Sequence, residues 1–183
     1  MRGNLESNLD RILIDEQTLK KRIAEMGAEI SKDYAGEELV VIGLLKGAAY
    51  FMMELTQHIT VPTRIDFLKA SSYGRGTTTS GKVDISFDTS RNMAGKNILL
   101  VDDVIDTGLT LKAVGELFRS RNPKSLKVAA MLDKKERRLV KVLPDYSGFA
   151  IPDEFVVGFG LDYDEDYRNL PYIGILKRSV YEK

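Results

Sequence analysis

Three carboxylates stand at the end of a strongly apolar segment. Residues 97–101 (NILLV) are typical of a buried β-strand, and Asp102, Asp103 and Asp106 follow them. Adjacent side chains in a regular strand point to opposite faces, so one carboxylate would be buried without a partner, which is costly. We therefore expect the strand to break at the acid pair, with both carboxylates turned towards solvent or a ligand. Two neighbouring carboxylates can accept the hydrogen bonds of a vicinal diol, such as that of a ribose.

The residues after the acid pair are suited to binding a phosphate. Asp106 is followed by Thr107, Gly108, Leu109 and Thr110, and a helix is expected from Leu109 onward. The free N–H groups and the positive end of a helix attract anions, and a glycine lets a phosphate approach the backbone. A diol site beside a phosphate site predicts a ribose 5-phosphate ligand. The alternative is a simple turn in which Asp106 caps the helix; the buried strand and the acid pair favour the ligand site.

Composition excludes several classes of protein. The chain has 183 residues, of which 43% are hydrophobic and 30% charged, as expected for a globular protein of one domain. Lys+Arg and Asp+Glu both number 27, and this zero net charge disfavours a nucleic-acid partner. Because there is no cysteine and the only histidine is His58, thiol chemistry and histidine-based metal centres are excluded. Any proton transfer then falls mainly on Asp, Glu, Lys or Tyr, and His58 is expected to be structural.

The chain also lacks the signals of a membrane or exported protein. Its first residues, MRGNLESNLD, contain no apolar segment of the signal-peptide kind. No apolar run approaches the roughly 18 residues that would suggest a membrane span. We therefore expect a cytoplasmic protein without a membrane partner.

The pattern of elements predicts an α/β fold. Helical and strand patterns alternate along the chain, which is typical of a mainly parallel sheet flanked by helices. In such a sheet, ligands bind beyond the carboxyl ends of the strands, where the acid pair lies. We expect a single domain over 1–183, with a core at approximately 36–143 and a small hood from 1–15 and 144–183. Helices are expected at 15–34, 47–59 and 109–121, and strands at 38–45, 63–69, 82–88, 97–101 and 125–132.

The acid pair and DTGLT together resemble the phosphoribosyl-diphosphate signature of type I phosphoribosyltransferases. Neither GxxxxGK[ST] nor GxGxxG occurs in the chain, so the common nucleotide folds are not supported. Further segments resemble the hypoxanthine-guanine phosphoribosyltransferases of bacteria, and with the signature they span roughly residues 40–176. These segments are LLKGAAYF (44–51), DFLKASSYGRGTTTSG (66–81), MLDKKERR (131–138) and IPDEFVVGFGLDYDEDYRNLPYIG (151–174).

This resemblance implies the type I phosphoribosyltransferase fold and a role in purine salvage. The implied reaction transfers the 5-phosphoribosyl group from phosphoribosyl diphosphate to hypoxanthine or guanine, giving IMP or GMP and pyrophosphate. It also implies Mg²⁺ as cofactor and a homodimer or homotetramer. Two rivals stay open: a non-catalytic regulator that binds the diphosphate, and a relative that prefers xanthine or adenine. The sequence does not rank hypoxanthine against guanine.

The resemblance also assigns roles around the sugar. It implies that Asp102 and Asp103 hold the ribose hydroxyls and that Asp106 acts as general acid or base at purine N7. Some members have lysine where this chain has Leu109, so the phosphate would depend here on backbone donors. The residues implied in 5-phosphate binding are Thr107, Gly108, Leu109 and Thr110.

Pyrophosphate and metal are implied to bind on the other side of the sugar. The family places Lys46, Gly47 and Arg168 at pyrophosphate, and holds the peptide between Leu45 and Lys46 in the cis form. Asp162 is implied as a magnesium ligand, together with the acid pair Asp102 and Asp103. The acids of DYDED (162–166) have an alternative interpretation as a solvated loop.

The purine is implied to contact Lys134, Phe155 and the main chain of Val156, under a lid that includes Ser72 and Tyr73. An ammonium group only donates hydrogen bonds, so Lys134 suits the 6-oxo group of hypoxanthine or guanine and faces adenine's amino group with a second donor. Without the resemblance, KKERR (134–138) would be taken as a solvated face and Phe155 as a core residue.

Overall fold

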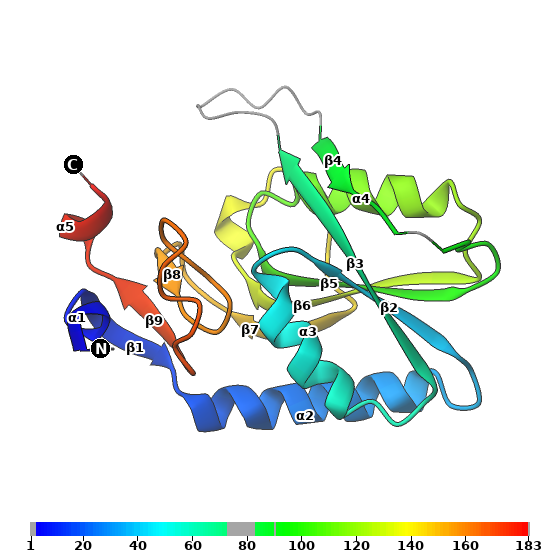
Figure 1. Ribbon diagram of the computed structural model, residues 1–183, viewed down its shortest axis with the longest axis horizontal. Helices are drawn as coiled ribbons and strands as arrows, with labels where there is room; N and C mark the ends of the chain where they lie inside the picture. Colours follow the sequence, from blue (N-terminus) through cyan, green and yellow to red (C-terminus); the bar gives the residue numbers. More distant parts are fainter. Residues whose placement is uncertain (1–2, 73–82, 90, 183) are drawn as a thin grey trace.

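The structure is a computed structural model that describes residues 3–72, 83–89 and 91–182 (Figure 1). The helices are α1 (Gly3–Glu6), α2 (Glu16–Asp33), α3 (Ala48–Gln57), α4 (Leu109–Arg119), the 3₁₀ turn η1 (Lys135–Arg137) and α5 (Arg178–Tyr181). The strands are β1 (Leu9–Ile14), β2 (Leu39–Leu44), β3 (Thr63–Ser72), β4 (Val83–Phe87), β5 (Asn97–Ile105), β6 (Ser125–Asp133), β7 (Tyr146–Ala150), β8 (Val156–Val157) and β9 (Ile173–Leu176).

A six-stranded sheet forms the core, in the order β4-β3-β2-β5-β6-β7. The strands from β3 to β7 pair in parallel, and only β4 runs antiparallel, against β3. Every residue of β2 is buried, as expected for a continuous apolar run in the centre of a covered sheet. This arrangement agrees with the mainly parallel sheet that the alternation of strands and helices predicts.

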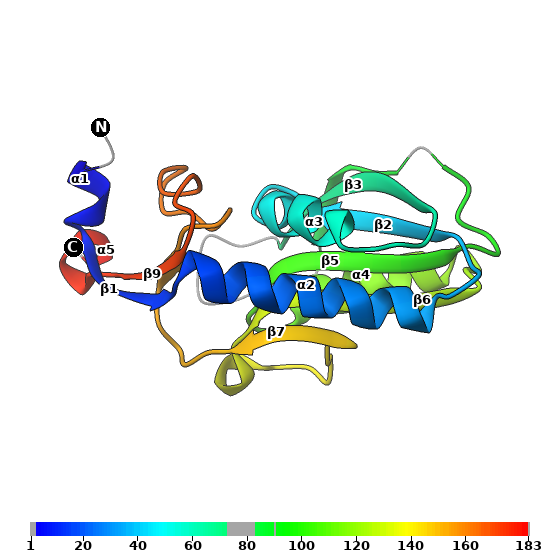
Figure 2. The same ribbon diagram turned by 90° about the horizontal axis from the view of Figure 1, so that it is seen from below.

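Helices cover both faces of this sheet. One face packs against α2 and α3 through a cluster that includes Leu19, Ile23 and Phe51, and the other packs against α4 through Val114 and Phe118. Figure 2 shows α2 running along the length of the sheet. The sheet is therefore buried between two helical layers, and its strand ends are left to form a site.

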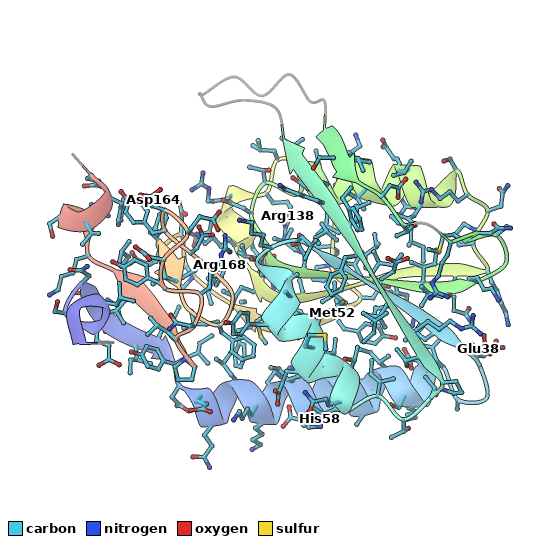
Figure 3. All side chains as sticks on the ribbon, in the orientation of Figure 1. Glu38, Met52, His58, Arg138, Asp164 and Arg168 are labelled. Atoms are coloured by element: carbon cyan, nitrogen blue, oxygen red, sulfur yellow. The ribbon has the colours of Figure 1, made fainter. Side chains whose placement is uncertain are left out.

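The first of these helices begins where its sequence predicts. The carboxylate of Asp15 accepts hydrogen bonds from the backbone N–H of Thr18 at 2.8 Å and from its hydroxyl at 2.9 Å, which caps α2. Near its middle, α2 approaches the end of α3 so closely that a methyl group at Gly27 would overlap His58 (Figure 3). The backbone and Cβ of His58 thus pack against α2, while its side chain is 37% exposed and lies 3.7 Å from Glu54; its structural role stays a prediction.

A second, three-stranded sheet in the order β1-β9-β8 forms the hood at one end of the core. It joins an N-terminal strand to the C-terminal segment, because β1 pairs antiparallel with β9. The predicted hood range 144–183 included β7, and this boundary is wrong: β7 pairs in parallel with β6 and belongs to the core sheet. In the C-terminal segment, the hood strands therefore begin with β8.

The expectation that β5 breaks at the acid pair is also wrong. Pairing with β2 ends at Val101, but pairing with β6 continues through Asp102 and resumes at Val104 and Ile105. The strand can continue because β6 still supplies backbone partners on one side after β2 has ended. Only Asp103 has no register partner on β6.

Among the described residues, no helix combines the length and the apolar character needed to cross a lipid bilayer.

Candidate active site

Most of the predicted site residues line one cavity of about 280 Å³ at the carboxyl ends of β2 and β5. Its walls come from the loop before α3, the end of β5, the start of α4 and the loop that follows β8. This position matches the general rule for ligand sites in parallel sheets. The predicted residues that line it are Lys46, Gly47, Asp102, Asp103, Asp106, Thr107, Gly108, Thr110, Asp162 and Arg168.

The acid pair is held by the backbone of its own strand. The N–H of Asp103 donates to Asp102 Oδ1 at 3.1 Å, and the N–H of Val104 donates to Asp103 Oδ1 at 2.9 Å. Burial, together with the charge of Asp103, raises the pKa of Asp102 well above its usual value, and burial raises the pKa of Asp103. Two crowded acids of this kind are stabilised as carboxylates by a cation or by hydroxyl donors.

Gly47 allows the loop before α3 to approach the acid pair. Its backbone lies in the ordinary helical region, so its conformation does not require glycine. A Cβ at this position would overlap the carboxylate of Asp103, and one at Gly160 would overlap the carbonyl oxygen of Gly47. Space, rather than backbone freedom, therefore requires glycine at position 47.

The loop from Asp106 to α4 has the features of an anion site. Gly108 has a φ of 82°, and its N-cap position offers α4 no side-chain hydrogen bond. The first N–H groups of a helix have no partner within the helix, and two residues of this first turn, Thr110 and Leu111, form part of the cavity wall. The N–H of Leu109 already donates to Thr107 Oγ1 at 3.4 Å, and the binding of a phosphate at this helix N-terminus stays a prediction.

Two arginines from the segment after β6 fix the position of Asp106. Arg137 Nε lies 2.8 Å from Asp106 Oδ1. Arg138 donates to the backbone oxygen of Asp106 at 2.9 Å and pairs with the buried Asp133 at the end of β6 (Figure 3). The main chain of the candidate general base is therefore tied to β6 through Arg138, whereas its buried Oδ1 meets Arg137 as an ion pair and makes no hydrogen bond with the described residues.

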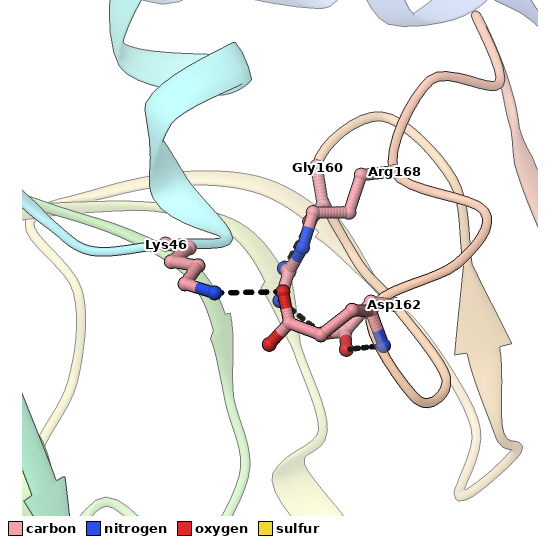
Figure 4. A network of polar contacts seen from close by, with 5 residues as sticks. Lys46, Gly160, Asp162 and Arg168 are labelled. Carbon is pink, nitrogen blue, oxygen red and sulfur yellow. Dashed lines mark hydrogen bonds and ion pairs between the residues drawn. The ribbon is translucent and has the colours of Figure 1, made fainter.

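A network of charges joins the hood to the core at the cavity (Figure 4). Arg168 donates to the carbonyl oxygen of Gly160 at 2.7 Å, and its Nη2 lies 2.9 Å from Asp162 Oδ1. Lys46 and Arg168 both contact Glu165 Oε2, at 2.7 and 3.3 Å. The hydrogen bond from Lys46 lowers the pKa of the Glu165 carboxyl. Arg168 Nε is buried and has no hydrogen-bond partner among the described residues, so a donor is available there.

The predicted purine residues Lys134, Phe155 and Val156 are not part of the lining of this cavity. Lys134 is 8% exposed, and its Nζ donates to the backbone oxygen of Glu154 at 2.7 Å. Phe155 stacks on Tyr181 with ring centroids 4.7 Å apart, which covers one face of its ring. Val156 is buried in β8.

Some predictions concern the edges of the site. The peptide between Leu45 and Lys46 is cis, as the resemblance implies. Leu109 is the first residue of α4 and does not line the cavity. Ser72 ends β3, and Tyr73 lies outside the described residues, so the lid stays a prediction.

Sequence reasoning missed Arg137, Arg138 and Glu165. The two arginines belong to KKERR, from which only Lys134 was selected. A usable signal existed, because this run directly follows a strand whose carboxyl end lies beside that of β5. For Glu165 the sequence offered no signal, since four acids stand within five residues in DYDED.

The residues of the cavity fit Mg²⁺ in part. Hard cations prefer oxygen ligands, and the raised pKa values of the acid pair mark a place where a cation would be stabilising. Within the described ranges, no three acidic or histidine side chains gather as a metal cluster, so Asp102, Asp103 and Asp162 do not converge on one ion. A bound Mg²⁺ would then take its other ligands from substrate oxygens and water, as this ion commonly does.

The cavity thus brings together a strand-end acid pair, a helix N-terminus and cationic side chains at the carboxyl ends of a mainly parallel sheet. The chain matches the phosphoribosyl transferase domain family over residues 11–164 and belongs to that family.

Similar proteins extend this match to the full chain. The hypoxanthine-guanine phosphoribosyltransferase of Streptococcus pneumoniae is 45% identical over 97% of this chain and 98% of its own length. That of Lactococcus lactis is 46% identical over 98% of each chain. The crystal structure of a hypoxanthine phosphoribosyltransferase from Staphylococcus aureus is 44% identical and superimposes over the whole of both chains with a TM-score of 0.97. One from Trypanosoma cruzi, solved as a ternary substrates complex, is 38% identical over 96% of this chain and 99% of its own, with a TM-score of 0.91. The predicted fold class and family resemblance are confirmed.

Proposed function

We propose that the protein transfers the 5-phosphoribosyl group of phosphoribosyl diphosphate to hypoxanthine or guanine, forming IMP or GMP and pyrophosphate in purine salvage. The observation that carries this proposal is the single cavity in which the acid pair, the N-terminus of α4 and the cations Lys46 and Arg168 come together. The names of the relatives with about 45% identity support hypoxanthine and guanine as the bases.

The acid pair and α4 hold the transferred group. Asp102 and Asp103 accept hydrogen bonds from the 2- and 3-hydroxyls of the ribose, for which two adjacent carboxylates are suited. The backbone N–H groups from Thr107 to Thr110 bind the 5-phosphate at the positive end of the helix. Leu109 can contribute only its backbone, so the site relies on amide donors at the position where some family members have a lysine.

The leaving group binds on the opposite wall. When the bond from C1 of the sugar to the diphosphate oxygen breaks, positive charge develops on the sugar and negative charge on pyrophosphate. Lys46 and Arg168 offset this negative charge, and the unpartnered Nε of Arg168 is one available donor. Mg²⁺, when bound to the substrate and the acid pair, would neutralise part of the same charge.

Asp106 accepts a proton from the incoming purine. The new bond forms between a ring nitrogen and C1, and the proton at N7 is taken up by the carboxylate. In the present structure this carboxylate pairs with Arg137. We propose that purine binding exchanges this ion pair for a hydrogen bond to N7.

Lys134 sets the choice of base. Its ammonium is buried and donates to the backbone beside Phe155, so a base that reaches Lys134 is favoured when it presents a hydrogen-bond acceptor. The 6-oxo group of hypoxanthine or guanine is such an acceptor, and the 6-amino group of adenine is not. Tyr181 stacks on one face of Phe155 and Tyr163 lies at an angle of 84° to the same ring, with centroids 5.7 Å apart, so a purine would stack on the part of the ring that these two tyrosines leave.

A panel of bases tests this function. With phosphoribosyl diphosphate and Mg²⁺, we expect hypoxanthine and guanine to give IMP and GMP, and adenine to give no measurable AMP in steady-state assays. Removal of Mg²⁺ with a chelator should abolish turnover, because the leaving group then keeps its full charge. Xanthine is included in the same panel because its turnover distinguishes a hypoxanthine-guanine enzyme from a relative that prefers xanthine. Turnover of adenine without turnover of hypoxanthine would contradict the proposal.

The homodimer or homotetramer, the cytoplasmic location and the absence of a nucleic-acid partner stay predictions. Sedimentation of the purified protein with and without phosphoribosyl diphosphate measures the first of them.

A further inference from the structure

Two cations assigned to pyrophosphate meet on one protein carboxylate. Lys46 reaches it from the loop before α3, and Arg168 reaches it from the hood (Figure 4). Both contact the same oxygen, Glu165 Oε2, at 2.7 and 3.3 Å. One anionic oxygen between two cations is the arrangement that an oxygen of a diphosphate would adopt there.

The turn that carries Glu165 has a defined shape. Tyr163 and Asp166 exchange backbone hydrogen bonds at 3.3 and 3.1 Å, which closes the turn. Glu165 has a φ of 68°, and its N–H donates to Asp162 Oδ2 at 3.0 Å. The carboxylate is therefore presented to the cations by a closed turn whose backbone is itself hydrogen-bonded.

We propose that Glu165 determines the affinity of the pyrophosphate site. Its carboxylate holds Lys46 and Arg168 in the absence of a diphosphate, competes with the diphosphate group for them, and pairs with them again as pyrophosphate leaves. This inference rests on the proposed function, which assigns both cations to pyrophosphate. It adds to the proposed function a residue that sets the affinity for phosphoribosyl diphosphate and for pyrophosphate without contacting the purine.

The ion pair between Lys46 and Glu165 is weak enough for a diphosphate to replace Glu165. The side chains of Lys46 and Glu165 are 55% and 62% exposed, so water and salt screen their attraction. A multiply charged diphosphate with bound Mg²⁺ can displace such a carboxylate, whereas a buried ion pair would resist displacement. The competition should therefore be modest and should weaken with increasing ionic strength.

Glu165→Gln tests the inference, because it removes the charge and keeps the size of the side chain. We expect the Kd for pyrophosphate with Mg²⁺, measured by calorimetry on the purified protein, to fall about two- to fivefold, the range of an exposed ion pair. The KM for phosphoribosyl diphosphate should fall by a similar factor, and the KM for hypoxanthine should stay unchanged. The gain should shrink as NaCl is added.

Asp164→Asn is the matched control. Asp164 is the neighbouring residue of the same turn, is exposed, and also has a positive φ of 53°. It takes part in neither of the two ion pairs that Glu165 makes with Lys46 and Arg168. Its substitution removes the same charge from the same turn, so it measures the long-range effect of charge alone. Glu165→Ser, which also removes the carboxylate, should behave like Glu165→Gln.

Two results would overturn the inference: unchanged or weaker pyrophosphate binding in Glu165→Gln, or an equal gain in Asp164→Asn. Damage to the turn would weaken binding, so it cannot imitate the expected gain. Calorimetry separates this inference from the proposed function. If Glu165→Gln binds pyrophosphate more tightly but the protein has no transferase activity, the inference stands and the proposed function is wrong. If the protein is an active transferase but Glu165→Gln leaves the Kd for pyrophosphate and the KM for phosphoribosyl diphosphate unchanged, the function stands and the inference is wrong.

Discussion

Replacement of Asp106 with asparagine is expected to lower kcat by about 10²- to 10⁴-fold, the usual contribution of a positioned general acid or base. The amide keeps the size of the side chain but cannot accept a proton at purine N7. The KM for phosphoribosyl diphosphate should change by less than about threefold, because the ribose and phosphate contacts come from other residues. Steady-state kinetics with hypoxanthine and IMP formation as readout measure both constants.

Asp153→Asn is the control for this substitution. Asp153 is the other carboxylate near Arg137, at 3.4 Å from Nη1, and it does not line the cavity. Asp153 also lies 3.9 Å from Lys134 Nζ, so its loss removes a negative charge beside both Arg137 and Lys134 and leaves Asp106 in place. We expect kcat to stay close to that of the unmodified protein, and the KM for hypoxanthine to report any effect that passes through Lys134. An Asp106→Asn enzyme with unchanged kcat would rule out the proton-transfer role.

Gly47→Ala is expected to lower kcat/KM for phosphoribosyl diphosphate by about 10²-fold or more. The added methyl group would overlap the carboxylate of Asp103, which is held in place by the N–H of Val104. A shift of the order of 1 Å in a residue that orients substrate can cost a factor of about 10². Overpacking costs about 1–3 kcal/mol of unfolding free energy, so the variant should still fold, which circular dichroism checks.

Gly115→Ala is the matched control, since it makes the same chemical change at a glycine with space around it. A Cβ there would meet only the far end of the flexible Arg119 side chain, at 3.3 Å. Alanine is favoured over glycine by about 1 kcal/mol inside a helix, so thermal stability should hold or rise and kinetics should not change. If Gly47→Ala were as active as Gly115→Ala, the close approach to Asp103 would have no role in the reaction.

The main elements could be predicted because their signals are local. The alternation of apolar runs defined the core strands, and the spacing of Leu19, Ile23, Met26 and Ile30 defined a helix whose buried face is made of these residues. The acid pair and DTGLT lie within one short segment, so their convergence at the end of β5 follows from a single strand-to-helix connection.

Contacts between distant segments could not be predicted in the same way. The continuation of β5 past Asp102 depends on β6, a strand that begins more than twenty residues later. The placement of β7 in the core rather than the hood depends on pairing that its short sequence does not encode. The pairing of Asp106 with Arg137, and of Lys46 with Glu165, likewise needs the assembled sheet and hood. Each of these features depends on contacts with residues distant in sequence, whereas the helices and strands themselves depend on local sequence patterns.

A crystal structure of the protein with IMP tests the central claim most directly. We expect the ribose hydroxyls within hydrogen-bond distance of Asp102 and Asp103, and the 5-phosphate on the backbone N–H groups between Thr107 and Thr110. A nucleotide bound elsewhere, or an acid pair that contacts only protein atoms in that complex, would contradict the account.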